Sequence, residues 1–160
     1  MKKFLIEIIY ILIGAATAFA IYYGLSIVLN TDMPIVAVES NSMVPVFYKG
    51  DLLVLKGVEP DELNVGDVIV FSPSPETLPI VHRIIYINPD GTFQTKGDAN
   101  IGQLPFEKAI RPESIHGKMI AIIPALGWVK IGINQYIIPN ILWILLIFII
   151  AYGLNSLMRR

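Results

Sequence analysis

The chain contains no cysteine, and it has few charged residues for its length. The lack of cysteine excludes disulfide bonds, thiolate metal sites and a thiol nucleophile. Charged side chains make up 16% of the 160 residues, against 54% for hydrophobic ones, and the net charge is −1. This composition is too apolar for an ordinary soluble domain. Since no basic run is present either, nothing in the charge pattern indicates nucleic acid as a partner.

Two segments carry no charge at all, residues 8–29 and residues 131–154. Each is long enough for a membrane span, which needs roughly 20 apolar residues. Small residues at 16–20 in the first segment are typical of a leader cleavage site, but the apolar run continues beyond them to Leu29. The apolar core of a leader covers only about 7–15 residues. We therefore expect an uncleaved anchor here rather than a cleavable leader.

The positions of the charges predict the domain organisation and the topology. We expect an N-terminal transmembrane anchor over 1–30, a β-rich domain over 31–135, and a C-terminal transmembrane helix with a basic tail over 136–160. The chain begins Met-Lys-Lys and ends Met-Arg-Arg, so both ends are basic. The positive-inside rule then assigns both termini to the cytoplasm. The middle domain would lie on the other side of the membrane.

The middle domain has the pattern of a β structure. Short runs rich in branched residues, bounded by Gly, Pro, Asn and Asp, cover residues 51–55, 67–71, 80–87 and 115–123. Asn-Pro-Asp-Gly at 88–91 predicts a hairpin turn. No amphipathic helical stretch of useful length is visible between residues 34 and 130. We expect a mainly β extracytoplasmic domain, a small barrel or folded-over sheet of about six to eight strands, flanked by two transmembrane helices.

The middle domain also contains the parts of a serine peptidase. A serine hydroxyl needs a base to take its proton, a histidine suits that task near neutral pH, and a carboxylate orients the histidine. Taken from the residues alone, the choice stays open, because serines mostly serve turns and caps, a histidine at a sheet edge is unremarkable, and Gly-Asp pairs are common in turns. The candidates are Ser40, Ser42, His82, His116, Asp51, Asp67 and Asp98.

Several sequence boxes, taken in order, resemble one known family. They are Ser-Asn-Ser-Met-Val-Pro at 40–45, Lys-Gly-Asp-Leu-Leu at 49–53, Val-Gly-Asp-Val-Ile-Val-Phe at 65–71, Val-His-Arg at 81–83, Thr-Lys-Gly-Asp-Ala-Asn at 95–100, Ile-His-Gly-Lys at 115–118, and Ile-Pro-Ala-Leu-Gly-Trp at 123–128. Together with the preceding anchor, this set is similar to signal peptidase I of the archaeal and endoplasmic-reticulum type. Bacterial members of the family carry lysine where this chain has His82.

The resemblance implies roles for four residues. Ser42 matches the nucleophile, His82 the general base, and Asp98 an acidic residue required by this branch. Ser40 matches a position whose hydroxyl contributes to the oxyanion hole in bacterial members, with the Ser42 backbone N–H as the second donor. Asp51 and Asp67 fall in boxes that look structural, and His116 falls outside the catalytic boxes.

The same resemblance implies a membrane-bound serine endopeptidase that removes N-terminal signal peptides from exported preproteins, cutting after small residues. Its partners would be signal peptides, the lipid bilayer and the secretion translocon. No cofactor or metal is implied. The location would be the cell membrane, or the endoplasmic reticulum membrane in a eukaryote. Two alternatives stay open: a peptidase dedicated to a few secreted or surface substrates, and an inactive signal-peptidase-like subunit of a membrane complex.

One position departs from the pattern of the family. Relatives in this branch usually carry a second aspartate six residues after the one matching Asp98, and this chain has Leu104 there. A leucine side chain accepts no hydrogen bond. Three explanations compete: Asp98 orients the histidine alone, Glu107 reaches in from a shifted loop, or activity is reduced. We expect the first, since the Thr-Lys-Gly-Asp-Ala-Asn box is intact and Glu107 lies three residues further along the chain.

Overall fold

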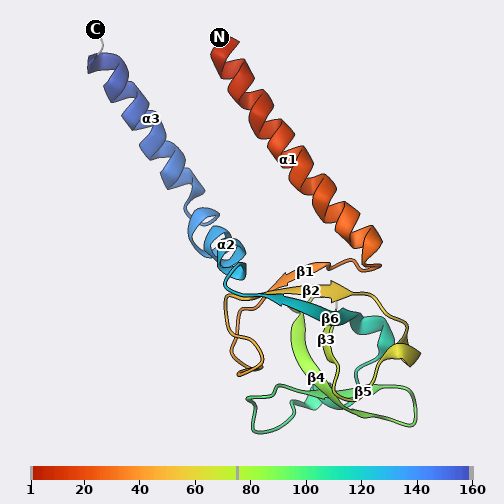
Figure 1. Cartoon of the computed structure of the whole chain (residues 1–160). Coiled ribbons are helices and arrows are strands. Elements are labelled where there is room, and N and C mark those ends of the chain that lie inside the picture. Colours follow the sequence, from red (N-terminus) through yellow and green to blue (C-terminus); the bar gives the residue numbers. More distant parts are fainter. Residues whose placement is uncertain (1, 75, 159–160) are drawn as a thin grey trace.

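The computed structural model describes residues 2–74 and 76–158. A long helix, six strands and a C-terminal helical region follow one another, with short 3₁₀ turns (η) between strands (Figure 1). The prediction that both ends of the chain are basic rests partly on Met1, Arg159 and Arg160, which lie outside the described residues. The elements are α1 Lys2–Val28, β1 Ile35–Ala37, β2 Leu52–Lys56, η1 Pro60–Glu62, β3 Val68–Phe71, β4 Ile80–Ile87, β5 Phe93–Lys96, η2 Pro105–Lys108, η3 Pro112–Ser114, β6 Ile115–Ile123, α2 Gly127–Gly132, the π-helical turn η4 Ile133–Ile137, and α3 Ile141–Met158.

Helix α1 is apolar on all sides and projects away from the sheet. Its stretch Leu5–Val28 covers 24 residues with a mean hydropathy of 2.1, and none of it is buried against the rest of the protein. It is therefore long and apolar enough to cross a membrane. The end of the helix is joined to the domain by a close backbone contact, where the Gly57 N–H donates to the Leu29 carbonyl at 2.8 Å. A Cβ at position 57 would lie 1.8 Å from the Asn30 carbonyl oxygen, so only glycine fits there.

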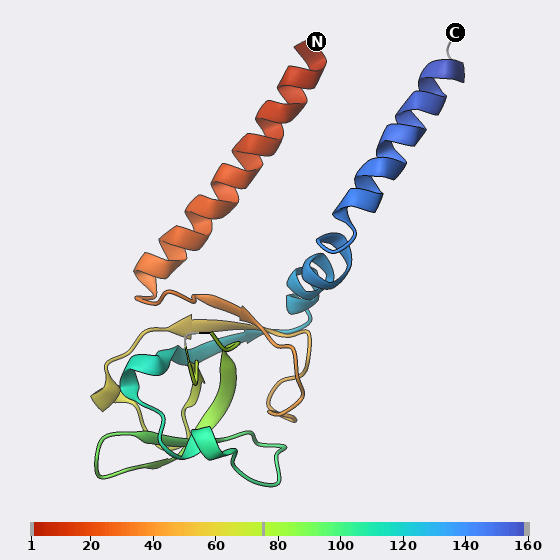
Figure 2. The ribbon, with the colours of Figure 1, turned by 180° about the vertical axis from the view of Figure 1, so that it is seen from behind.

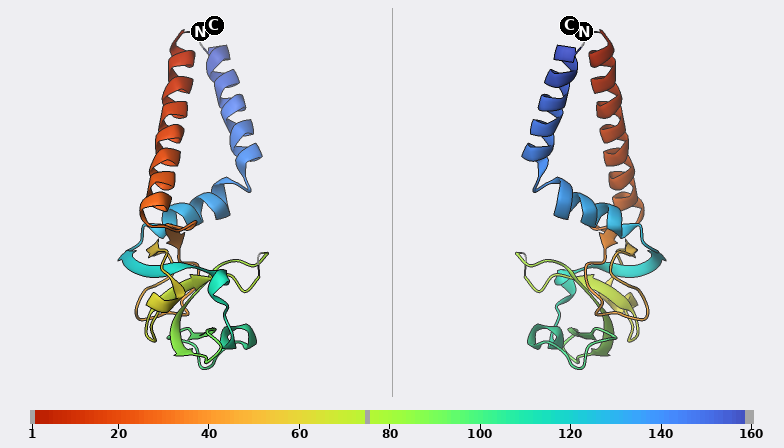
Figure 3. Two further views of the ribbon diagram at one scale, coloured as in Figure 1. Left: turned by 90° about the vertical axis from the view of Figure 1, so that its right-hand side faces the viewer. Right: turned by 90° about the vertical axis from the view of Figure 1, so that its left-hand side faces the viewer.

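From the sequence we expected a single helix beginning at residue 136. The second apolar segment is instead broken into two helical parts. Residues 127–137 form α2 and η4, and α3 begins only at Ile141, after a turn that contains Pro139. The two parts meet at an angle of 73°, and Figure 3 shows α2 running steeply across the direction of α3. A proline cannot donate the backbone hydrogen bond that would continue the helix through this point. Helices α1 and α3 leave the sheet on the same side (Figures 1 and 2).

The sheet is open, so the barrel-like closure expected from the sequence is wrong. Its six strands lie in the order β1-β2-β6-β3-β4-β5, and all neighbouring pairs are antiparallel. Closure would require β5 to pair with β1. Instead, the free edge of β5 is occupied by Ile110, whose N–H and carbonyl both bond to Phe93. β1, only three residues long, is left as the other edge.

The remaining β predictions are confirmed, with small shifts at the strand ends. The expected runs correspond to β2, β3, β4 and β6. The turn at 88–91 joins β4 to β5, and the Asn88 N–H donates to the Thr92 carbonyl at 2.8 Å. Gly91 has a φ of +83°, which suits the turn. These elements follow from short-range patterns, which explains why the sequence was sufficient to locate them.

Strand β3 divides the hydrophobic core in two. Its four residues are all buried, and successive side chains point to opposite faces. Val68 and Val70 pack with Met43 and Phe47 on one face, while Ile69 and Phe71 pack with a second group on the other. The second group consists of Leu63, Ile84, Phe93 and Ile110. The first cluster therefore holds the segment that follows β1 against the sheet, which places the serines of that segment.

Candidate active site

Ser42 lies in a loop, and the side chain of the next residue, Met43, is completely buried. Met43 is 0% exposed and belongs to the first core cluster. The ends of the loop are closed by two backbone bonds, from the Val38 N–H to the Asp51 carbonyl and from the Gly50 N–H to the Val38 carbonyl. Ser42 itself is half-buried. Because its neighbour is locked in the core, the serine hydroxyl is presented from a fixed backbone.

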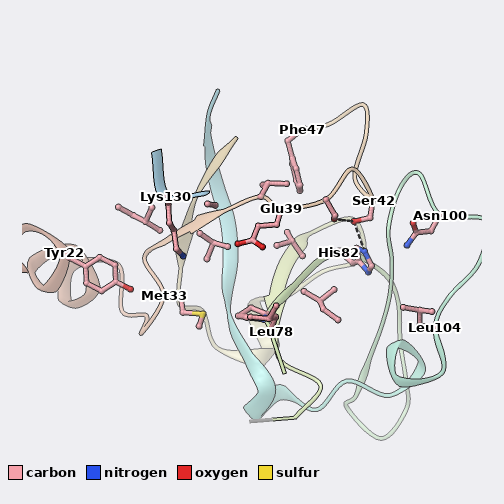
Figure 4. A pocket seen from close by; sticks show the side chains of 18 residues that line it. Tyr22, Met33, Glu39, Ser42, Phe47, Leu78, His82, Asn100, Leu104 and Lys130 are labelled. Carbon is pink, nitrogen blue, oxygen red and sulfur yellow. Dashed lines mark hydrogen bonds between the residues drawn. The ribbon is translucent and has the colours of Figure 1, made fainter. Parts of the chain in front are cut away.

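His82 lies next to Ser42 although 40 residues separate them in sequence. The Ser42 Oγ is 3.1 Å from His82 Nε2, so the hydroxyl can donate to that ring nitrogen. His82 is 4% exposed and sits within β4, where it pairs with Ile69 of β3. Ser40 Oγ lies 3.3 Å from Ser42 Oγ on the solvent side. Figure 4 shows the serine and the histidine facing one another at one end of a pocket.

The other ring nitrogen of His82 contacts Glu107, not Asp98. His82 Nδ1 and Glu107 Oε1 are hydrogen-bonded to one another, and both side chains are buried. The same oxygen accepts from Thr95 Oγ1 at 3.2 Å, and Oε2 accepts from the Leu104 backbone N–H at 2.7 Å. Glu107 and Thr95 are both 0% exposed. Ser42, His82 and Glu107 therefore form a continuous hydrogen-bonded chain.

Glu107 reaches the histidine because the chain turns sharply after Leu104. Pro105 opens the 3₁₀ helix η2, and the Glu107 N–H donates back to the Leu104 carbonyl at 3.0 Å. Proline at the first helical position and a glutamate at the third, bonding back to the residue before the helix, are both favoured at helix starts. Leu104 stands where Ser or Thr would complete the capping box, so the sequence shows only part of this pattern. Separation along the chain alone makes Glu107 look too far from His82.

Asp98 forms an ion pair with Arg83 instead of contacting His82. Arg83 Nε donates to both Asp98 oxygens at 3.0 and 3.2 Å, and Nη2 donates to Oδ2 at 2.6 Å. The hydrogen bond to Asp98 raises the pKa of Arg83 above its ordinary value. Adjacent residues of a strand point to opposite faces, so Arg83 and its partner lie on the other side of β4 from His82. The expected contact between Asp98 and His82 is therefore replaced by one with Glu107.

The Thr-Lys-Gly-Asp-Ala-Asn box acts as a turn that supports the serine segment. The Ala99 N–H donates to the Ser42 carbonyl at 2.8 Å. A Cβ on Gly97 would lie 2.7 Å from that same carbonyl oxygen and 2.8 Å from His82 Nε2. The box therefore needs glycine at 97 for close approach to both residues, and Asp98 fixes the outer side of the turn through Arg83.

A second Ser-His-Asp array is built around His116. Ser72 Oγ lies 2.8 Å from His116 Nε2, and His116 Nδ1 lies 3.0 Å from Asp32 Oδ2. The Ser72 backbone N–H, however, donates to the Ser114 carbonyl, so it is not free to bind an oxyanion. Thr31 Oγ1 also donates to the His116 carbonyl at 2.6 Å. This array joins the segment after α1 to β6, and distances between three side chains do not by themselves identify a nucleophile.

The aspartates of the two boxes that looked structural hold loops. Asp51 accepts from the Tyr48 N–H at 2.8 Å and from the Ala125 N–H at 3.0 Å. Asp67 accepts from the Asn64 N–H at 2.9 Å and pairs with Lys118 at 2.7 Å. Neither contact involves Ser42 or His82, which agrees with the structural interpretation of both boxes.

A pocket of about 530 Å³ extends from Ser42 and His82 toward the end of α1. One wall follows β1 and the residues after it, and the opposite wall follows residues 78–81. Tyr22 and Lys130 lie at the far end, and Asn100 and Leu104 lie beyond the Ser-His pair at the near end (Figure 4). The lining is mostly apolar, with Glu39 in the middle of one wall. Its shape suits an extended chain laid beside β1.

The sequence matches one family model and several curated proteins. The family model, described as signal peptidase, peptidase S26, matches residues 5–99. A signal peptidase complex catalytic subunit sec11 from Dictyostelium discoideum is 35% identical over 150 residues, which cover 88% of this chain and 82% of that protein. The subunit SEC11C from Homo sapiens is 35% identical over 152 residues, covering 87% and 76%. SEC11 from Lachancea thermotolerans is 40% identical over 132 residues, covering 75% and 77%.

Proposed function

The chain belongs to the signal peptidase family, peptidase S26, and on that premise we propose that Ser42 is its nucleophile and His82 its general base. As a member of this family, the chain is a serine peptidase that removes signal peptides from preproteins. The observation that carries the assignment is that Ser42 and His82, 3.1 Å apart, both line the pocket, whereas Ser72 and His116 are not among its lining residues.

The chemistry begins with transfer of the Ser42 hydroxyl proton to His82 Nε2 while the oxygen attacks the scissile carbonyl. The negative charge then moves to the former carbonyl oxygen, which needs donors already in place. In the part of the chain that the structure describes, the Ser42 N–H has no protein acceptor. The Ser40 hydroxyl, 3.3 Å from Ser42 Oγ, supplies the second donor. His82 returns the proton to the leaving amine, and water then releases the acyl group by the same route.

The substrate would lie in the pocket as an extended strand beside β1. β1 is an edge strand, and among the described residues no strand lies on its outer side. An extended peptide can add to such an edge. Val36, Val38 and Val81 are among the apolar residues that line the pocket together with Ser42. We propose that this apolar lining accepts the small side chains that precede the cut. The leader would enter from the Tyr22 end, where α1 leaves the domain.

Membrane attachment is the second part of the proposal. The length and hydropathy of helix α1 support one membrane span. We add a second span formed by α3, with α2 and η4 lying across its direction near the sheet (Figure 3). Both termini would face the cytoplasm, with the sheet domain outside in the cell membrane or the endoplasmic reticulum membrane. Two relatives are named as catalytic subunits of a signal peptidase complex, which supports protein partners for this chain. We propose the translocon as a further partner, with the leader itself as substrate.

The test is cleavage of a preprotein by the full chain purified in detergent. Wild type should release mature protein cut after a small residue, and Ser42→Ala should release none. Ser72→Ala is the matched control, because Ser72 also contacts a histidine at 2.8 Å and yet should leave cleavage within about threefold of wild type. Equal cleavage by wild type and Ser42→Ala would refute the assignment of the nucleophile.

A further inference from the structure

We propose that Glu107 is the positioning carboxylate of His82, in the role that the sequence interpretation gave to Asp98. The inference rests on the proposed function of Ser42 and His82 and concerns how their geometry is maintained. Its basis is the hydrogen bond from His82 Nδ1 to Glu107 Oε1, within a site where both residues are almost completely buried.

The burial of Glu107 is difficult to explain by stability alone. Moving a carboxylate out of water is costly unless it is paired and hydrogen-bonded. Glu107 is 0% exposed, and it meets this requirement with donors from His82, Thr95 and the Leu104 backbone. A pair of apolar residues would fill such a site at no electrostatic cost. A buried acid bonded to a histidine that faces a serine is the arrangement expected when the acid has a chemical task.

The contacts of Glu107 orient the histidine in one direction. The Leu104 N–H holds Oε2, and Thr95 Oγ1 approaches Oε1, so the carboxylate cannot rotate freely. With Nδ1 donating to Oε1, the neutral ring has its proton on Nδ1 and a free lone pair on Nε2. That lone pair faces Ser42 Oγ at 3.1 Å. When Nε2 takes the serine proton, the carboxylate stabilises the positive charge on the ring.

Asp98 is occupied elsewhere and does not compete for this role. Both oxygens of Asp98 accept hydrogen bonds from Arg83. The Asp98 side chain is 23% exposed and the Arg83 side chain 31%. His82 and Arg83 are consecutive in β4, so their side chains point to opposite faces. Reaching His82 would require Asp98 to leave the guanidinium and cross the strand. The two acids therefore serve adjacent residues from separate faces of the sheet.

Leu104 is consistent with the same division of tasks. Its backbone N–H binds Glu107 Oε2, while its side chain, 46% exposed, lines the pocket beside Ser42 and His82. The residue thus contributes to orienting the acid through its main chain and leaves its side chain on the substrate side. A leucine at this position needs no loss of activity to explain it, since the acid arrives from three residues further on.

The experiment compares Glu107→Gln, Glu107→Asp and Asp98→Asn in the full chain, using kcat, KM and the pH profile on one preprotein. Removal of the orienting carboxylate lowers kcat by about ten thousandfold in the well-studied serine proteases. We expect Glu107→Gln to lower kcat at least about a hundredfold with KM within about threefold. The pH at which the rate is half-maximal should move down, because the anion that favours the protonated ring is gone.

The two companion variants separate a positioning role from a structural one. Glu107→Asp keeps the charge on a shorter side chain, so it should recover part of kcat and return the pH profile toward that of wild type. Asp98→Asn should stay within about tenfold of wild type with no change in the pH profile. If Glu107→Gln does not fold, the Glu107→Asp and Asp98→Asn profiles still decide the matter.

Either of two results would overturn the inference. One is a Glu107→Gln enzyme with nearly normal kcat, and the other is an Asp98→Asn enzyme with a shifted pH profile beside a Glu107→Asp enzyme that keeps the full kcat of wild type. Both require that wild type cleaves and Ser42→Ala does not. A failure of that first comparison would count against the proposed function itself, so the two outcomes are distinguishable.

Discussion

Gly97 approaches His82 so closely that a Cβ at position 97 would lie 2.8 Å from His82 Nε2. The same methyl group would lie 2.7 Å from the Ser42 carbonyl oxygen. Real Cβ atoms do not approach other atoms this closely, so the turn at 97–100 packs against the serine and the histidine at the same place. The distance from Ser42 to His82 is therefore set partly by a residue with no functional group.

The first prediction is that Gly97→Ala lowers kcat/KM by at least about a hundredfold. An added methyl would displace His82 or Ser42, and misplacing a reacting group by about 1 Å costs on the order of a hundredfold. Gly102→Ala is the matched control, because nothing lies within 4 Å of its added Cβ. Kinetics on one preprotein test this, and a Gly97→Ala enzyme as active as Gly102→Ala would show that the turn has room to move.

The second prediction separates the two histidines. His82→Ala should abolish cleavage, because no other base contacts Ser42 in the described residues. His116→Ala should keep activity but reduce stability, since it loses contacts with Ser72 and Asp32. Hydrogen bonds contribute about 0.5–1.5 kcal/mol each, and the exposed Asp32 puts this loss at the lower end. Thermal unfolding in detergent and cleavage rates distinguish them, and a dead His116→Ala beside an active His82→Ala would reverse the roles.

The third prediction concerns the second oxyanion donor. Ser40→Ala should lower kcat by about ten- to a thousandfold with KM little changed, because the hydroxyl interacts with charge that develops only in the transition state. Ser40→Thr should retain a larger part of the rate, since it keeps a hydroxyl at the same position. Steady-state kinetics with both variants provide the measurement. Unchanged kcat in Ser40→Ala would show that the Ser40 hydroxyl is not an oxyanion donor.

The fourth prediction is the topology. A protease added outside right-side-out vesicles should cut the loop 72–79, which joins β3 to β4 at the surface and contains the 81%-exposed Leu78. Tags at both termini should remain protected until the vesicles are opened with detergent. Immunoblots against the two tags provide the measurement. Digestion of either tag in closed vesicles would place that terminus outside and contradict the proposed pair of spans.

Much of the fold could be predicted from the sequence because it depends on local patterns. The apolar length of α1, the branched runs of β2, β3, β4 and β6, and the turn at 88–91 each follow from a few adjacent residues. The open edge could not be found in this way. It depends on Ile110 bonding to Phe93 across a loop of irregular structure, which occupies the backbone groups that a closing strand would have used. The break at 138–140 contains a visible proline, but the angle of 73° depends on how the two parts pack.

A long apolar N-terminal helix, a β domain, and a serine and a histidine in the boxes of the family could all be predicted from the sequence. Which acid contacts that histidine could be found only from the packed loops. Separation along the chain does not give distance in space, because a loop can return through a turn such as η2 and carry Glu107 to His82. Strand alternation carried Arg83, and with it Asp98, to the opposite face of β4. A hydrogen-bond partner is chosen by position and burial, and both exist only once the loops have packed.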